Sequence, residues 1–185
     1  MDTTTQKKSS VRFTYHDYTL LSEDKRYEII EGDLYMTPSP TTIHQRISAA
    51  IGLRLAEFIL KNKLGEILYA PMDVVLSDED VIQPDILFIS NDRKGIVKPE
   101  NIRGAPDLVV EILSPSTANR DLVTKKKLYA RHAVREYWIV NPNEKTVEVM
   151  TWTEQGFKTV QVYPRGSRLA SPLLAGFSLS MDEIF

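Results

Sequence analysis

The run Asp107-Leu-Val-Val-Glu-Ile-Leu113 decides the fold of this chain. Five of its seven residues are Leu, Val or Ile, which is typical of a strand buried on both faces of a sheet. Glu111 interrupts the run, and an ionised carboxylate in such a place costs free energy unless it is paired or bound to a metal. Glu111 is therefore either a metal ligand or one partner of an ion pair with an Arg or Lys.

A second acid can reach Glu111 from a different strand. Asp85 opens the strand-like stretch 85–89, and neighbouring strands lie only ~4.8 Å apart. Asp107 is a weaker partner, because residues four apart on one strand are separated by roughly 13 Å. Acids that follow proline are also common turn residues, so the case for Asp85 depends on Glu111. We expect Asp85 beside Glu111, and Asp107 outside that pair at the start of its strand.

The apolar periodicity on both sides of these strands predicts helices packed on a sheet. The clearest helix spans Ile43 to Asn62, with Thr41 and Thr42 offering an N-cap and Gly65 just beyond its end. Further helices are expected over 13–23 and from 119 or 121 to about 132, and further strands over 27–31, 33–36, 66–70, 73–76, 136–140, 146–152 and 157–163. This order predicts an α/β or α+β fold, with a mixed sheet flanked by helices and extra antiparallel strands at the C-terminus.

Composition limits the class of protein. The 185 residues, 42% of them hydrophobic, fit one globular domain, which we place at 13–185 after a disordered tail at 1–12. The chain has no cysteine, which excludes disulfides and Cys-ligated zinc. No secretory signal or run of ~20 apolar residues is found, so we expect a cytoplasmic protein without a membrane partner. The net charge of −2 means that nucleic-acid binding requires a local basic patch.

The predicted helix near residue 125 is the best candidate for such a patch. It carries several Lys and Arg residues against a single acid, Asp121, which suits a phosphate backbone but also an ordinary solvated helix. The basic residues are Arg120, Lys125, Lys126, Lys127, Arg131 and Arg135. Helical spacing places Asp121, Lys125 and Tyr129 on one face. Lys125 therefore either pairs with Asp121 or reaches the acids of the sheet.

Several motifs together resemble the Uma-type family, whose members are described as endonucleases. The resemblance covers roughly Phe13 to Tyr163. The motifs that carry it are Tyr27-Glu-Ile-Ile-Glu-Gly-Asp33, Ser39-Pro40 with His44, Ala70-Pro71 with Asp73-Val74, Gln83-Pro-Asp-Ile-Leu-Phe-Ile89, Gly104-Ala-Pro-Asp-Leu-Val-Val-Glu-Ile-Leu-Ser-Pro-Ser-Thr117, Asp121, Lys125, Tyr129-Ala130 and Val134-Arg-Glu-Tyr-Trp-Ile-Val-Asn-Pro142.

The resemblance implies the PD-(D/E)XK restriction-endonuclease-like fold and a nuclease that hydrolyses DNA with Mg²⁺ or Mn²⁺. It assigns Asp85 and Glu111 as metal-binding acids and the main-chain carbonyl of Ile112 as a further ligand. The usual lysine of that superfamily would stand two residues after the second acid, where this chain has Leu113. The family pattern instead selects Lys125, which would complete the catalytic set as a displaced lysine.

Other assignments stay open at the level of sequence. A nuclease fold without cleavage activity, acting as a nucleic-acid or protein-binding module, and hydrolysis of another phosphate ester are the alternatives. Restriction-like nucleases often act as dimers, so a homodimer is one expectation. We expect His44 at the surface, at most one of Glu28 and Glu31 facing the core, and Tyr137 and Trp138 inside the core rather than stacking on bases.

Overall fold

The computed structural model describes residues 11–22, 24–114 and 120–185. Its helices are α1 (Tyr15–Thr19), α2 (Thr42–Asn62) and α3 (Lys126–Arg131), preceded by a π-helical turn η2 (Arg120–Lys125), with short 3-10 turns η1 (Asn91–Ile96) and η3 (Met181–Glu183). Its strands are β1 (Arg26–Ile30), β2 (Asp33–Thr37), β3 (Gly65–Tyr69), β4 (Val74–Ser77), β5 (Asp80–Ile82), β6 (Ile86–Ser90), β7 (Ile102–Arg103), β8 (Leu108–Ile112), β9 (Glu136–Asn141), β10 (Thr146–Thr153), β11 (Gly156–Pro164), β12 (Arg168–Ala170) and β13 (Ser178–Ser180).

The strands divide among three sheets. The large sheet has the order β11-β10-β9-β8-β6-β3, and the small sheet has the order β2-β1-β5-β4-β7. A two-stranded sheet, β12-β13, follows near the C-terminus. Both larger sheets are mixed, since β8 and β9 are parallel, as are β4 and β7, while the other pairs are antiparallel. The predicted mixed α+β fold, with antiparallel strands at the C-terminus, is confirmed.

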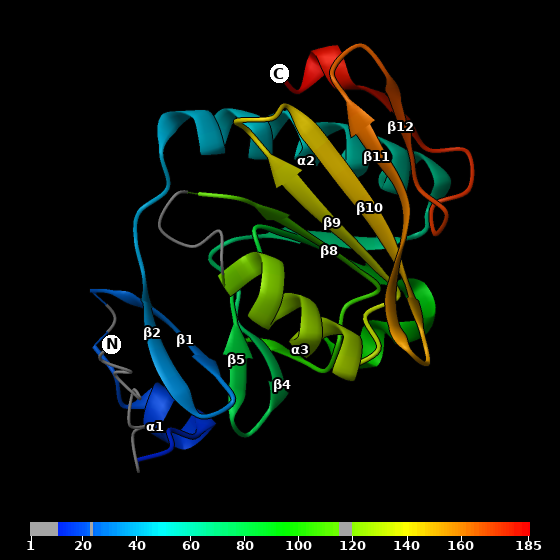
Figure 1. Ribbon diagram of the computed structural model, residues 1–185. Coiled ribbons are helices and arrows are strands. Elements are labelled where there is room, and N and C mark those ends of the chain that lie inside the picture. Colours follow the sequence, from blue (N-terminus) through cyan, green and yellow to red (C-terminus); the bar gives the residue numbers. More distant parts are fainter. Residues whose placement is uncertain (1–10, 23, 115–119) are drawn as a thin grey trace.

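The large sheet is covered on both faces (Figure 1). On one face, Ile47, Ile51, Leu55 and Ile59 of α2 pack on the sheet together with the C-terminal segment. On the other face, α3 and the small sheet cover a second apolar cluster. The strand β8 runs through the middle, buried at all five positions. Its alternate residues therefore point into two different compartments, which decides where the carboxylate of Glu111 goes.

Helix α2 begins where the sequence predicts, because the Thr41 side chain accepts a hydrogen bond from the amide of His44. It ends at Asn62, as predicted. Lys63, in the left-handed conformation with φ 54°, forms the C-cap. Gly65 instead opens β3, where a Cβ would lie 2.1 Å from the carbonyl oxygen of Ile89. Ile43 belongs to the apolar residues whose three- and four-residue spacing predicts this helix, but it lies off the buried face and is 57% exposed.

Two further expectations concern the ends of the chain and membranes. Of the predicted tail 1–12, residues 1–10 lie outside the described residues, and Arg12 forms an ion pair with Glu79. The start predicted for the helix at 119 also lies outside them, and the described part begins with η2 at Arg120. No helix in the described part of the chain is long and apolar enough to cross a membrane.

Candidate functional site

Glu111 is the next-to-last residue of β8, and its side chain lies between this strand and the helix that carries Tyr129. Its neighbours Val110 and Ile112 pack under α2, so strand alternation directs Glu111 to the opposite face. There Oε1 accepts hydrogen bonds from Lys125 Nζ at 3.0 Å and from the Tyr129 hydroxyl at 2.5 Å. Lys125 and Tyr129 share one face of the helix, as their spacing predicts. The side chain of Asp121, the third residue predicted on that face, lies outside the described residues.

Lys125 joins the two larger sheets. Its Nζ lies 2.8 Å from Glu28 Oε1, on β1 of the small sheet, and 3.0 Å from Glu111 Oε1, on β8 of the large sheet. All three side chains are at least 95% buried. Glu28 also accepts a hydrogen bond from the Gln83 amide at 3.0 Å. Of the alternatives that the sequence leaves open, the structure contains the ion pair of Glu111 with a lysine, and it brings Lys125 to acids of both sheets in a buried, charged triad.

Glu31 takes no part in this triad. Its side chain is half-exposed and lies 3.0 Å from Arg131 Nη1. The expectation that at most one of Glu28 and Glu31 faces the core is therefore confirmed, and Glu28 is the one that does.

Asp85 immediately precedes β6, which pairs with β8 through Ile86 and Val110. One step beyond that pair, the register places Asp85 level with Glu111. Its Oδ2 accepts a hydrogen bond from the Ile112 amide at 2.8 Å and lies 3.1 Å from His44 Nε2. Asp85 thus connects the start of β6 with β8 and with α2.

The expected surface position of His44 is wrong. The residue is only 8% exposed and lies against Asp85 at the first turn of α2. Its spacing to Ile47 and Ile51, three and seven residues further on, places it on the buried face of the helix and could have revealed this from the sequence.

Ile112 and Leu113 complete the end of β8. The amide of Ile112 donates a hydrogen bond to Asp85. That its carbonyl binds a metal stays a prediction. Leu113 belongs to the apolar cluster under α3 and the small sheet, together with Leu128. The position two residues after Glu111 is therefore apolar, and the cationic side chain beside Glu111 is that of Lys125.

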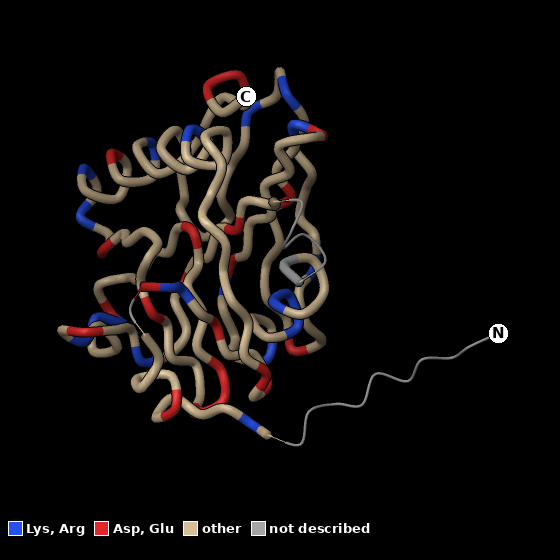
Figure 2. Tube along the Cα trace, turned by 90° about the vertical axis from the view of Figure 1, so that its left-hand side faces the viewer, with Lys and Arg blue, Asp and Glu red and all other residues tan. Residues whose placement is uncertain are grey.

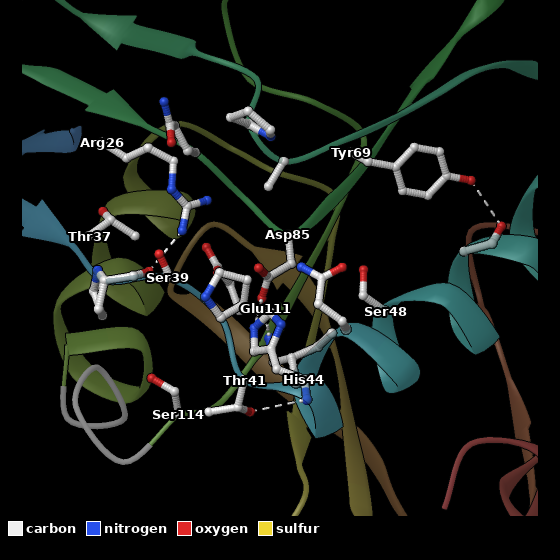
Figure 3. Close-up of a pocket in the computed structure, with 18 of the residues that line it drawn as sticks. Arg26, Thr37, Ser39, Thr41, His44, Ser48, Tyr69, Asp85, Glu111 and Ser114 are labelled. Atoms are coloured by element: carbon white, nitrogen blue, oxygen red, sulfur yellow. Dashed lines mark hydrogen bonds and ion pairs between the residues drawn. The ribbon is translucent and has the colours of Figure 1, made fainter. Parts of the chain in front are cut away.

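A pocket of about 680 Å³ is lined by Glu28, His44, Asp85, Glu111, Ile112 and Lys125, among others. Figure 3 shows Asp85, Glu111 and His44 near its centre. Three acids, Glu28, Asp85 and Glu111, and two cationic side chains, Arg26 and Lys125, contribute to the lining. The formal charges of these five side chains sum to −1, which is compatible with a bound cation.

The proposed acids suit a hard cation in the chemistry of their donors, since Mg²⁺ is commonly held by one or two carboxylates and keeps several waters. Within the described ranges, no three His, Asp or Glu side chains are arranged as a ready metal cluster. Asp85 and Glu111 with the Ile112 carbonyl would form the smaller set that Mg²⁺ accepts. A metal ion at these residues would therefore keep mainly water ligands, because few protein ligands surround it.

The burial of Tyr129 next to Glu111 raises the pKa of its hydroxyl well above the ordinary value, first through loss of solvation and then through the nearby negative charge. The hydroxyl therefore stays protonated at neutral pH and remains a donor to Glu111. Tyr137 and Trp138 are fully buried, as predicted for core residues.

The predicted basic face around residues 120–135 is not confirmed as a continuous patch. Lys125 is buried, Arg131 pairs with Glu31 and Asp80, and Arg135 lies 3.1 Å from Asp107. Figure 2 shows Lys and Arg interspersed with Asp and Glu along the trace. These cations are drawn into ion pairs because acids of the sheets lie beside them.

Asp107 lies apart from the pocket, as expected. It is fully buried and accepts a hydrogen bond from the Ser90 amide at 2.8 Å, with Arg93 and Arg135 beside it. Its role is to hold the start of β8 to the end of β6.

Comparison with known proteins identifies the family. Residues 14–182 match the model of the Uma2 family, described as "Putative restriction endonuclease". The chain belongs to the Uma2 family. A crystal structure from Anabaena variabilis ATCC 29413, described as "a putative nuclease belonging to DUF820", superposes with a TM-score of 0.78 at 22% identity, covering 94% of this chain and 97% of that one. The search of curated proteins found no match.

Membership of the Uma2 family confirms the resemblance seen in the sequence, and the Anabaena structure confirms the nuclease-like fold. The matched range contains every residue of the buried triad together with Asp85 and His44. Family and neighbour thus agree on a nuclease-like fold.

Proposed function

We propose that this chain hydrolyses phosphodiester bonds in DNA with Mg²⁺ or Mn²⁺ held by Asp85 and Glu111. The observation that carries the proposal is the position of Lys125, whose ammonium lies beside Glu111 and Glu28 although Leu113 fills the usual lysine position. A lysine with its charged end in the interior is costly, so its burial against two carboxylates at a pocket marks a functional site.

In the proposed reaction, the oxygen of a water molecule forms a bond to phosphorus and one ester oxygen leaves. The products are a phosphate monoester and a free hydroxyl, with protons supplied by water. A bound divalent cation would polarise the phosphate and make its water a stronger nucleophile. Lys125 would donate to a phosphate oxygen where negative charge grows in the transition state, an effect commonly worth ~3 kcal/mol or more.

The remaining residues would hold these groups in place. The Ile112 amide and His44 fix the carboxylate of Asp85, and Tyr129 fixes that of Glu111. Glu28 holds the ammonium of Lys125 from the small sheet. Such positioning is worth free energy in catalysis because the polar groups need not reorganise during the reaction.

The test is cleavage of plasmid DNA and of single-stranded DNA in Mg²⁺ and in Mn²⁺. Asp85→Asn should remove cleavage, while Asp78→Asn, which changes an exposed acid outside the pocket, should leave it intact. Cleavage that persists in EDTA, or in Asp85→Asn, would contradict the metal assignment.

A nuclease fold that binds nucleic acid or a protein without cutting is the second candidate. The observation in its favour is that Lys125 is already engaged by Glu28 and Glu111, while the described residues form no ready cluster of three metal-binding side chains. It predicts binding without cleavage in either metal, so the same assay separates the two functions.

A further inference from the structure

The pocket has two chemically different ends, with Asp85 between them. Figure 3 shows Tyr69 on one side of Asp85, and Arg26, Thr37 and Ser39 on the other. Gly52 of the lining lies against the Tyr69 ring, and Leu53, Ala70 and Pro71, the chain neighbours of Gly52 and Tyr69, also line the pocket. An elongated ligand that crosses the acids would therefore meet an aromatic surface at one end and polar groups at the other.

Tyr69 is fixed in place although it is 41% exposed. Its hydroxyl donates a hydrogen bond to the carbonyl oxygen of Gly52 at 3.1 Å. A Cβ at Gly52 would lie only 2.5 Å from Cε1 of the ring, so the missing side chain is what allows the ring to rest against α2. An exposed ring that is held rigidly loses little conformational entropy on binding, which suits a stacking surface.

The ring is also close to the acids in the fold. Tyr69 pairs with Ile86 in the ladder between β3 and β6, and the amide of Ala70 donates to the carbonyl oxygen of Asp85 at 3.1 Å. Tyr69 is thus one residue step from the position opposite Asp85. A base stacked on this ring would place its own backbone phosphate near the carboxylates.

Polar groups at the other end of the pocket suit a phosphate. Arg26 donates to the carbonyl oxygen of Pro38 at 2.8 Å, which holds its guanidinium at the pocket wall. The Thr37 hydroxyl is buried and has no hydrogen-bond partner among the residues that the structure describes. A phosphate oxygen could accept from both groups.

We propose that this pocket binds a single, unpaired nucleic-acid strand, with one base stacked on Tyr69 and the next phosphate at Arg26 and Thr37. The inference rests on the proposed phosphodiesterase function and specifies its substrate class. In a duplex the faces of each base are covered by its neighbours, whereas an unpaired base can stack on an aromatic side chain. A pocket of about 680 Å³ is also of the size that holds a small ligand, which a nucleotide is and a duplex is not.

The experiment measures binding of a single-stranded oligonucleotide containing 2-aminopurine, and of the same sequence as a duplex, in EDTA and again with Ca²⁺. The variants are Tyr69→Leu, which removes the ring, and Tyr69→Phe, which keeps it. Trp152→Leu is the matched control, because Trp152 is 38% exposed and lies outside the pocket. Thermal melting checks that each variant is folded.

The expected result is a preference for the single strand with quenching of 2-aminopurine fluorescence by the wild type, Tyr69→Phe and Trp152→Leu. Tyr69→Leu should bind the single strand about tenfold more weakly and lose the quenching. Equal binding by Tyr69→Leu, a preference for the duplex, or no binding of the single strand overturns the inference.

Cleavage assays on the same proteins separate this inference from the proposed function. Single-strand binding that depends on Tyr69, without cleavage in Mg²⁺ or Mn²⁺, would uphold the stacking site and overturn the nuclease activity. Metal-dependent cleavage of duplex DNA that is undiminished in Tyr69→Leu would uphold the nuclease activity and overturn the stacking site.

Discussion

Lys125 and Glu111 are 14 residues apart in sequence, yet Nζ of the lysine lies 3.0 Å from Oε1 of the glutamate in the protein interior. Glu28, on the small sheet, approaches the same ammonium to 2.8 Å. This contact therefore ties a helix to both larger sheets at the wall of the pocket, and it links the stability of the fold to the proposed chemistry.

We predict that Lys125→Ala lowers the rate of metal-dependent cleavage about a hundredfold or more, because it removes a positive charge beside the reacting phosphate. Lys126→Ala and Lys127→Ala should weaken DNA binding only mildly, and less at high salt, since these side chains are more exposed. Rates are compared below the melting temperature of the least stable variant. Equal rates for wild type and Lys125→Ala would contradict the role of the lysine.

The second prediction concerns stability. Lys125→Met leaves Glu28 and Glu111 buried without their shared cation, and removing one partner of a buried pair commonly costs about 3–5 kcal/mol. Adding Glu28→Gln to this variant removes one of the two buried negative charges and should restore part of the lost free energy of unfolding. Urea unfolding at neutral pH measures both effects. If the double variant is no more stable than Lys125→Met, charge is not the cause.

The third prediction tests metal binding without an activity assay. Mn²⁺ should raise the melting temperature of the wild type, because a ligand that binds only the folded state stabilises it. Glu111→Gln should remain folded, since Lys125 keeps Glu28 and Tyr129 can still donate to the amide oxygen, but its melting temperature should no longer respond. Glu57→Gln, at an exposed position outside the pocket, should respond like the wild type.

The fourth prediction concerns pH and Asp80, which lies between the small sheet and α3. Burial raises the pKa of this carboxyl, but His132, the Glu31 amide and the Ser77 hydroxyl outweigh burial, and Arg131 adds to their effect, so that the pKa falls to about 2 from 3.8. The folded pKa is depressed, so the stabilisation is present above about pH 4 and is lost as the pH falls toward 2.

Asp80→Asn should therefore lower the free energy of unfolding by about 2 kcal/mol at pH 7, with the difference from wild type shrinking below pH 4. Denaturant unfolding across this pH range measures the gap. Asp78→Asn, two residues away and exposed, is the control and should show little change at any pH. A gap that stays constant down to pH 2 would show that the loss is not electrostatic.

Much of the fold is predictable from local pattern. The buried run of β8, the long helix α2 and the hairpin of β1 and β2 follow from apolar periodicity and turn residues, and the structure contains all three. Short elements such as β5, β12 and β13, with three residues each, carry too little periodicity to be recognised. The division into separate sheets depends on such short strands and was therefore also missed.

The site was predictable where one helix face brings residues together, as for Lys125 and Tyr129. Asp85 and Glu111 line the same pocket, and their sharing of one metal ion stays a prediction. The contact of Glu28 with Lys125 was not predictable, because it depends on how the small sheet packs against α3. The burial of His44 was misjudged because its polarity was given more weight than its position on the apolar face of α2. The motifs of the family indicated Lys125, rather than Lys126 or Lys127, as the lysine of the site.

The buried triad has a consequence for how this protein can change over evolutionary time. Loss of Lys125 alone leaves two carboxylates buried without their shared cation, which lowers stability. Loss of both acids leaves the lysine buried without either carboxylate, which lowers stability as well. Lineages that abandon catalysis should therefore lose the lysine together with one of the acids, most simply Glu28. Joint loss of the lysine and one acid among homologous sequences would distinguish members that no longer cleave from members that still do.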